Sequence, residues 1–249
     1  MAARNEQPGL NFSHASKKGF RIWLVMTLGL ASLGVLQLLI ASLVAALHFP
    51  EGYSMEDNFI SDLGRSSHEY SDLFNFSLIF LGLSLFPLFI SLIIVDSRDS
   101  FSMKLAAGFG VLSATGLVGL GLTPIDKFLI SHYLALGLWL FPMFYMLIVF
   151  YYGATRTAYV GIGFLSLSLF TVVLMLVVLL RANATGYQVV QKLIVAFGLV
   201  WLLYIMAFIL QSGRLILKTM KEPDNSIAEL EDEYFSEMYR QKAAQQKRV

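Results

Sequence analysis

Six long apolar stretches alternate with short polar segments along this chain. A transmembrane helix needs roughly 20 predominantly apolar residues to cross about 30 Å of hydrocarbon, and each stretch meets that requirement. The stretches cover residues 20–47, 73–95, 103–122, 128–152, 159–180 and 189–212. Each is continuously apolar and lacks the alternation of a membrane β-strand, so the pattern predicts an all-α polytopic membrane bundle of six transmembrane helices.

The composition strengthens this prediction. Hydrophobic residues make up 57% of the chain and charged residues only 14%, too few charges to cover a soluble domain of this size. A net charge of +1 gives no reason to expect a nucleic acid as partner. The chain has no cysteine, which excludes disulfides, thiolate nucleophiles and Cys-ligated metals. We expect no cofactor and no bound metal.

The distribution of Lys and Arg predicts the orientation, because cytoplasmic loops carry an excess of both. One side of the predicted bundle has Lys17, Lys18, Arg21, Arg98, Lys104, Arg156, Arg214, Lys218 and Lys221, and the other has only Arg65, Lys127, Arg181 and Lys192. We therefore expect both termini to be cytoplasmic. The outer loops are then residues 49–72, 123–127 and 181–188, the last containing a glycosylation sequon at Asn183.

This orientation divides the chain into three parts. A polar N-terminal tail covers residues 1–19, the transmembrane domain covers 20–213, and a charged C-terminal tail covers 214–249. The first apolar stretch is too long for a cleaved signal peptide and is interpreted as a retained helix. For the C-terminal tail two interpretations remain open: a solvated segment, or a docking segment for a protein partner or anionic lipid heads.

An internal repeat links the second and fourth stretches. Residues 81–89 and 136–144 differ at only two positions and share a Gly and a Pro at the same spacing. The repeat predicts two-helix hairpins arranged in parallel, with Pro87 equivalent to Pro142 and Ser77 equivalent to His132. The third stretch is rich in small residues, which allow helices to approach closely, and it is expected at the centre of the bundle.

Polar residues gather at the predicted outer end. In the first outer loop, Phe59, Ile60 and Leu63 interrupt an acidic segment, so we expect it to fold back onto the bundle with Ser61 and Asp62 near the membrane interface. His132 lies inside an apolar helix, where an ionisable side chain is costly without a partner. The candidate ligand-binding residues are Ser61, Asp62, Arg65, Asn75, Asp126 and His132.

These motifs resemble the membrane-protein family catalogued as domain of unknown function 998. The resemblance rests on the string 60–64, on Asn75 and on the stretch from Gly121 through Asp126 to His132. It covers residues 20–212 and implies a fold but no general activity. The Ser-Asp-x-Gly element is also similar, more distantly, to an outer loop of the Frag1/DRAM/Sfk1 group, six-helix proteins linked to lipid remodelling or membrane organisation.

Several functions remain open on this evidence. The candidate residues predict a site for a membrane lipid or another amphipathic ligand, unless they only cap helices and fix loops. His132 beside Asp62 and Asp126 is compatible with an intramembrane lipid hydrolase or transferase, although no catalytic motif is present. A transporter of a hydrophilic substrate is disfavoured because the middle of the spans contains almost no ionisable residue, and Lys192 is explained as snorkelling from a helix end. A transporter of an apolar substrate remains an alternative. A non-catalytic subunit or scaffold of a membrane complex is the remaining alternative.

Overall fold

The computed structural model describes residues 17–96, 101–154 and 187–220. In this part of the chain the regular structure is entirely helical. The elements are α1 (Lys17–Leu47), the short 3₁₀ helix η1 (Ile60–Gly64), α2 (Ser71–Val95), α3 (Phe101–Leu122), α4 (Leu129–Ala154) and α6 (Tyr187–Thr219). The predicted fifth helix, the sequon at Asn183 and most of both tails lie outside the described residues.

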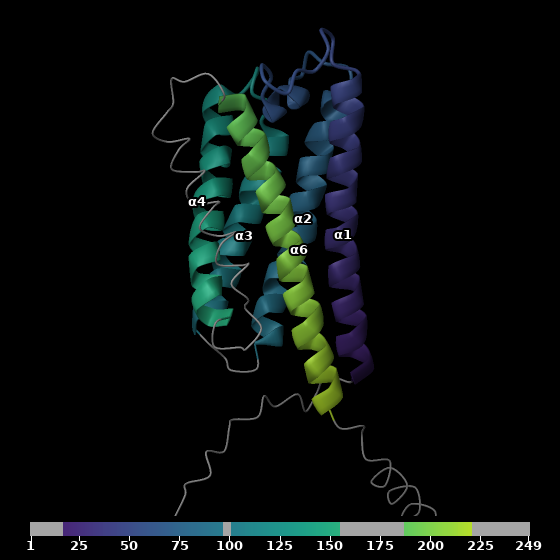
Figure 1. Ribbon diagram of the computed structural model, residues 1–249, viewed down its shortest axis with the longest axis vertical. Coiled ribbons are helices and arrows are strands. Elements are labelled where there is room, and N and C mark those ends of the chain that lie inside the picture. Colours follow the sequence, from purple (N-terminus) through teal and green to yellow (C-terminus); the bar gives the residue numbers. More distant parts are fainter. Residues whose placement is uncertain (1–16, 97–100, 155–186, 221–249) are drawn as a thin grey trace, which may run out of the picture.

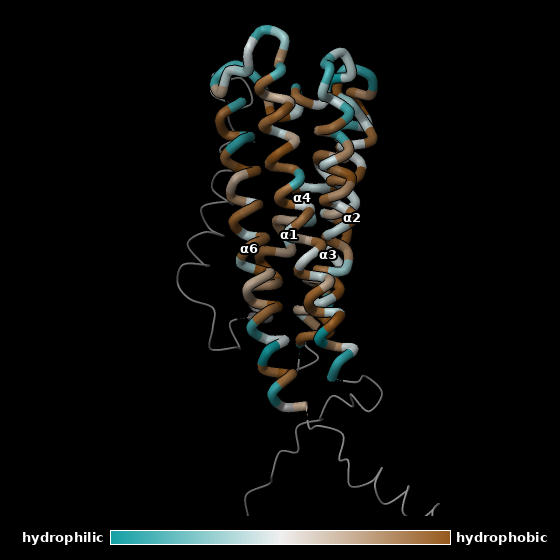
Figure 2. Tube along the Cα trace, turned by 90° about the vertical axis from the view of Figure 1, so that its right-hand side faces the viewer, coloured by the Kyte–Doolittle hydropathy of each residue, from teal (hydrophilic) through white to brown (hydrophobic). Residues whose placement is uncertain are grey.

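All five long helices are long and apolar enough to cross a membrane. Within an apolar segment of 18 residues in each helix, only 33–50% of the residues are buried in the protein, so much of the hydrophobic surface of these helices faces outward. Figure 2 shows hydrophobic residues along the helix bodies and hydrophilic residues toward their ends. The chain is thus an integral, multi-pass membrane protein, and five of the predicted spans are confirmed.

The helices run along one axis, with η1 and its loop at one end of the bundle, the upper end in Figure 1. We call this the η1 end. Helices α1 and α3 run toward it, whereas α2, α4 and α6 run away from it. Among the described elements, α2 packs against α1, α3, α6 and η1, while α3 packs chiefly against α2 and α4. Among the described elements α2 thus has the most neighbours and α3 the two most extensive helix contacts. The central position predicted for the third helix stays a prediction, because residues 159–180 lie outside the described structure.

Helix α1 packs along one narrow seam. Its buried residues include Phe20, Leu24, Thr27, Ala31, Gly34, Leu38, Ala41 and Ala45. Their alternating spacing of four and three residues keeps one face of α1 turned toward the bundle. Near the far end of the seam, Trp23 Nε1 donates a hydrogen bond to Ser91 Oγ on α2 at 3.1 Å. The remaining faces are apolar and exposed, as at Val25 and Met26, which suits contact with lipid.

The predicted close approach of α3 to its neighbours is confirmed at particular glycines. A Cβ atom at Gly116 would lie closer than 3.0 Å to the backbone of Leu138 and Trp139 on α4. At Gly110 it would meet the ring of Phe89 on α2, whereas at Gly108 it would meet nothing within 4 Å. Only some of the small residues in α3 therefore form helix contacts.

The segments of the internal repeat have unequal surroundings. Both α2 and α4 continue as helices through Pro87 and Pro142. A Cβ atom at Gly82 would lie 2.7 Å from the carbonyl oxygen of Ala114 on α3, but at the equivalent Gly137 it would meet only Phe141 of its own helix, at 3.8 Å. Among the described residues the shared glycine thus has no common packing role, and the repeat stays a prediction.

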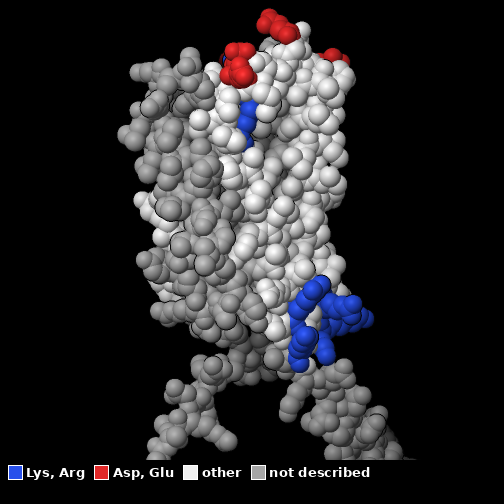
Figure 3. All heavy atoms as spheres, viewed as in Figure 1, with Lys and Arg blue, Asp and Glu red and all other residues white. Residues whose placement is uncertain are grey.

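Charge divides the two ends of the bundle. Figure 3 shows acidic side chains at the η1 end and a group of basic side chains at the opposite end. The basic end contains the start of α1, with Lys17, Lys18 and Arg21, and the last turns of α6, with Arg214 and Lys218. This is the asymmetry from which the sequence predicted the orientation.

Candidate functional site

The loop at the η1 end folds back onto the bundle around Asp62. The Phe59 amide donates to Asp62 Oδ2 at 2.7 Å, and Arg65 Nε donates to Asp62 Oδ1 at 2.9 Å. Both carboxylate oxygens are thus occupied, which allows Asp62 to be 6% exposed. Leu63 is buried as predicted. Asp62 is buried as well, because its own loop satisfies its charge, and its place near the membrane interface stays a prediction.

Asn75 fastens η1 to α2. Its Nδ2 group donates to the Gly64 carbonyl oxygen at 2.9 Å, and a Cβ atom at Gly64 would collide with the Asn75 side chain. The glycine therefore permits the two elements to touch. Asn75 has a structural role at this contact, in line with the interpretation that some candidate residues fix the loop.

Asp126 joins the two loops at the η1 end. It accepts hydrogen bonds from the Ser66 amide at 3.0 Å and from the Ser66 hydroxyl at 2.6 Å. Partial burial acts to raise the pKa of Asp126, but the two Ser66 hydrogen bonds outweigh it and hold that pKa below its ordinary value. Asp126 is therefore a carboxylate that bridges loops.

His132 points one ring nitrogen at a loop and leaves the other without a protein partner. The side chain is 6% exposed, and its Nδ1 lies 2.7 Å from the Thr123 carbonyl oxygen. Because a carbonyl oxygen only accepts, Nδ1 carries the hydrogen and Nε2 of the neutral ring is an acceptor. Nε2 has no hydrogen bond to the described residues.

Two further residues, both on α6, complete this region. Neither is among the site residues predicted from the sequence. Gln191 Oε1 accepts from the Ile60 amide at 2.9 Å. Lys192 Nζ donates to the carbonyl oxygens of Met55, at 2.8 Å, and Asn58, and it lies 5.3 Å from the centroid of the Tyr53 ring. Lys192 thus extends from the end of α6 to the loop, where carbonyl oxygens hold its ammonium group. A polar amide one turn into an apolar helix was the available signal for Gln191.

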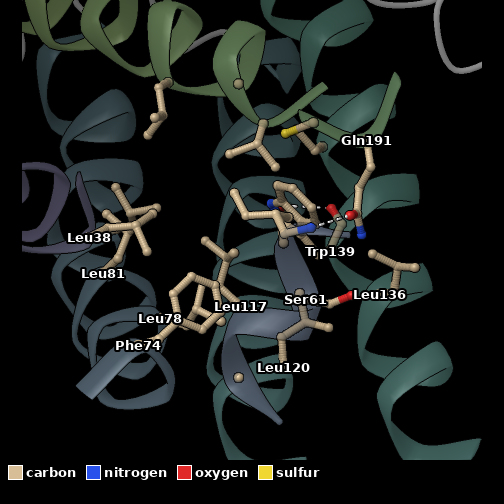
Figure 4. Close-up of a pocket in the computed structure, with 18 of the residues that line it drawn as sticks. Leu38, Ser61, Phe74, Leu78, Leu81, Leu117, Leu120, Leu136, Trp139 and Gln191 are labelled. Carbon is tan, nitrogen blue, oxygen red and sulfur yellow. Dashed lines mark hydrogen bonds between the residues drawn. The ribbon is translucent and has the colours of Figure 1, made fainter. Parts of the chain in front are cut away.

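Two adjoining cavities lie between these elements. The mouth cavity, about 380 Å³, is bordered by η1, α4 and α6. The deep cavity, about 80 Å³, extends between α1, α2, α3, α4 and α6. Residues shared by both linings mark the junction: Ser61, Ile125, His132, Leu136, Trp139 and Gln191. Figure 4 shows Ser61, Trp139 and Gln191 on one side of the deep cavity, with Leu38, Phe74, Leu78 and Leu81 on the other.

The structure brings the predicted site residues together around these cavities. Ser61 and His132 line both, Asp62, Arg65 and Asp126 line the mouth cavity, and Asn75 lines the deep cavity. Their shared position agrees with the sequence prediction, and their role in binding stays a prediction. Away from the junction the deep cavity is lined mainly by apolar side chains.

The chemistry available here is chiefly hydrogen bonding. In the described residues no three His, Asp or Glu side chains are placed to hold a metal ion. No hydrogen bond joins His132 to Ser61 within residues 17–96, 101–154 and 187–220, so a nucleophile activated by a base is not formed there. The junction instead offers an acceptor at His132, a hydroxyl at Ser61 and an amide NH₂ group at Gln191.

Comparison with known proteins adds no relative to this picture. No model of a known family matches the chain, and no curated protein or solved structure matches it either.

Proposed function

We propose that this membrane protein binds a lipid or another amphipathic molecule at the junction of the mouth and deep cavities. The observation that carries the proposal is the arrangement of the linings. Polar groups lie at the η1 end, and apolar side chains from five helices continue below them. A pocket that is mostly apolar with a few converging polar groups is the usual form of a ligand site.

The hydrogen bonds separate residues that fix the structure from residues that can receive a ligand. Asp62, Asn75 and Asp126 are engaged with the loops. By contrast, His132 Nε2 and the Ser61 hydroxyl have no hydrogen bond to the described residues. Neither atom is among the fully buried unpartnered side-chain atoms of the described residues, so an occupant would exchange a hydrogen bond to water for its own, a net gain of about 0.5–1.5 kcal/mol for each bond.

The proposal includes a sixth transmembrane span within residues 155–186. Its support comes from the described helices on either side, because α4 ends at the basic end and α6 begins at the η1 end. The apolar stretch 159–180 is long enough to make that connection as a helix. We also propose that the η1 end is extracytoplasmic. We further propose that the helices form parallel two-helix hairpins and that the chain has the fold of the family catalogued as domain of unknown function 998, which it resembles. The C-terminal tail is proposed to bind a protein partner.

A cavity-filling substitution tests the ligand site. Val195 lines the deep cavity, so Val195→Trp is expected to fill it. Val200 lies on the same helix but is 50% exposed, and Val200→Trp is the matched control. The measurement is crosslinking of a photoactivatable lipid to the purified protein in mild detergent. We expect Val195→Trp to lose at least about tenfold in apparent affinity, or ~1.4 kcal/mol, and Val200→Trp to bind like the parent chain.

Equal crosslinking of all three proteins would overturn the proposal, provided that the variants elute as the same single species in gel filtration. Mapping the crosslinked peptides adds an independent check. Adducts on the cavity-lining side of α4 and α6 support the site, whereas adducts confined to the exposed face of α1 indicate only annular lipid.

A further inference from the structure

The charges around the mouth cavity are arranged unfavourably for an anionic lipid head. Its described lining contains two carboxylates, Asp62 and Asp126, and one cation, Arg65. The Arg65 charge is already paired with Asp62 at 2.9 Å. The described lining of the mouth cavity therefore has one more negative than positive charge, which disfavours a phosphate there.

The nearby ammonium group of Lys192 interacts through its charge with Asp62, but it is already bonded to the loop. Its Nζ atom is held by the carbonyl oxygens of Met55 and Asn58, and Lys192 is absent from the described lining of both cavities. To reach a phosphate it would have to release the loop. A lipid phosphate thus has no available partner of the kind that Lys and Arg usually supply.

The groups that remain available at the junction are uncharged. His132 Nε2 is an acceptor on a side chain that is only 6% exposed. Gln191 Oε1 accepts a hydrogen bond from the backbone N–H of Ile60. The Nε2 group of the same side chain is a donor, and it has no hydrogen bond to the described residues. The Ser61 hydroxyl can donate or accept. All three residues line both cavities.

A ligand must donate a hydrogen to satisfy His132 Nε2 and must accept one to satisfy Gln191 Nε2. A single alcohol group does both, because it carries one donor and two acceptor lone pairs. An ester or ether oxygen only accepts and would leave the His132 acceptor unsatisfied. The complementarity therefore selects a free hydroxyl over the other oxygen groups of neutral lipids.

We propose that the ligand is an uncharged lipid with a free hydroxyl group, which donates to His132 Nε2 and accepts from Gln191 Nε2. Its hydrocarbon part lies against the apolar walls of the two cavities, such as Leu78 and Leu117. This inference rests on the proposed function, since it names the chemical class of the molecule in that site. Diacylglycerols and sterols both carry this chemistry.

The test compares lipids that differ only in the head. Dioleoylglycerol, its O-methyl ether and dioleoyl phosphatidic acid are titrated into delipidated protein in mild detergent, and binding is measured by native mass spectrometry. Cholesterol and its methyl ether form a second arm that separates a rigid sterol from an acyl lipid. We expect the free alcohol in at least one arm to bind at least about tenfold more tightly than its ether, as ~1.4 kcal/mol of lost hydrogen bonding predicts, and phosphatidic acid to bind more weakly than dioleoylglycerol.

The variant His132→Asn probes the acceptor directly. The Asn amide can keep the bond from the δ position to the Thr123 carbonyl oxygen, but it has no atom at the position of Nε2. We expect it to lose the preference for alcohol over ether. The lipid comparison on the parent chain needs no variant, so a His132→Asn protein that fails to fold leaves the test intact.

Two kinds of failure are distinguishable. If alcohol, ether and phosphate bind equally, or phosphate binds best, while Val195→Trp weakens all of them, the cavity is a lipid site and the hydroxyl inference is wrong. If no lipid in either arm binds more weakly to Val195→Trp than to Val200→Trp, both the inference and the proposed function fail.

Discussion

At the scale of single residues, Tyr53 shows that a side chain of the loop at the η1 end is removed from water and packs against its neighbours. Its hydroxyl group is buried without a hydrogen-bond partner in the described structure, and its ring packs edge-on against Phe49 at 5.6 Å. Burial, and secondarily the negative charge of Asp62, raise the pKa of Tyr53 to about 12. The neutral phenol is therefore favoured in the folded state.

This shift predicts a loss of stability at alkaline pH. The unfolded phenol ionises near pH ~10, whereas the folded one ionises at about 12. The stabilisation that the neutral, buried phenol gives to the folded state is thus fully present below pH ~10. It is lost as the pH rises toward the folded-state pKa of Tyr53. Tyr53→Phe removes this penalty, and we expect its alkaline unfolding midpoint, followed by circular dichroism, to move to higher pH.

Tyr145→Phe is the control for this experiment, since Tyr145 is 51% exposed on α4. It should unfold at the same pH as the parent chain. If Tyr53→Phe also keeps the parent midpoint, the Tyr53 hydroxyl is hydrated and the burial described above is wrong.

The residues of the candidate site were predictable to the extent that they break an apolar pattern. His132 stands out within a hydrophobic helix, and Asp62 and Asp126 stand out in short loops. Gln191 was missed because it lies near a helix end, where polar residues are common. The sequence also gave no means of separating Asn75, which is fastened to Gly64, from His132, which leaves a nitrogen facing the cavities. That distinction depends on partners brought together by the fold.

At the scale of elements, the glycines of α3 predict a sharp contrast between two similar substitutions. Gly116→Ala would push a methyl group into the backbone of Trp139 and Leu138, and overpacking of this kind typically costs about 1–3 kcal/mol. Gly108→Ala meets open space and should be neutral or stabilising by up to ~1 kcal/mol, because Ala is the better helix former. Thermal unfolding in detergent compares the two.

Similar melting temperatures for both variants would contradict the tight contact between α3 and α4. The sequence predicted close packing from the small residues of α3 but not which glycine makes it, because Gly108 and Gly116 look alike until a neighbouring helix is in place. For the same reason the neighbours of α2 were not predictable. Helix spans follow from apolar length, whereas helix neighbours depend on surfaces that meet only in the folded bundle.

At the scale of the whole molecule, the orientation in the membrane can be tested with introduced cysteines, because the chain has none of its own. Glu56 is exposed in the loop at the η1 end and Lys218 is exposed near the basic end. We expect a membrane-impermeant maleimide to label Glu56→Cys on intact cells and Lys218→Cys only after permeabilisation, as the excess of Lys and Arg at that end predicts. The reverse pattern would invert the proposed topology.

Gln191 has a further consequence, because its amide has two ends with different tasks. Oε1 holds the Ile60 amide at 2.9 Å, while Nε2 is the end proposed to receive a ligand. The same side chain therefore holds η1 in place and lines both cavities. A substitution at Gln191 is expected to disturb the loop and the cavity walls together, so its effect on binding cannot be assigned to the lost amide alone.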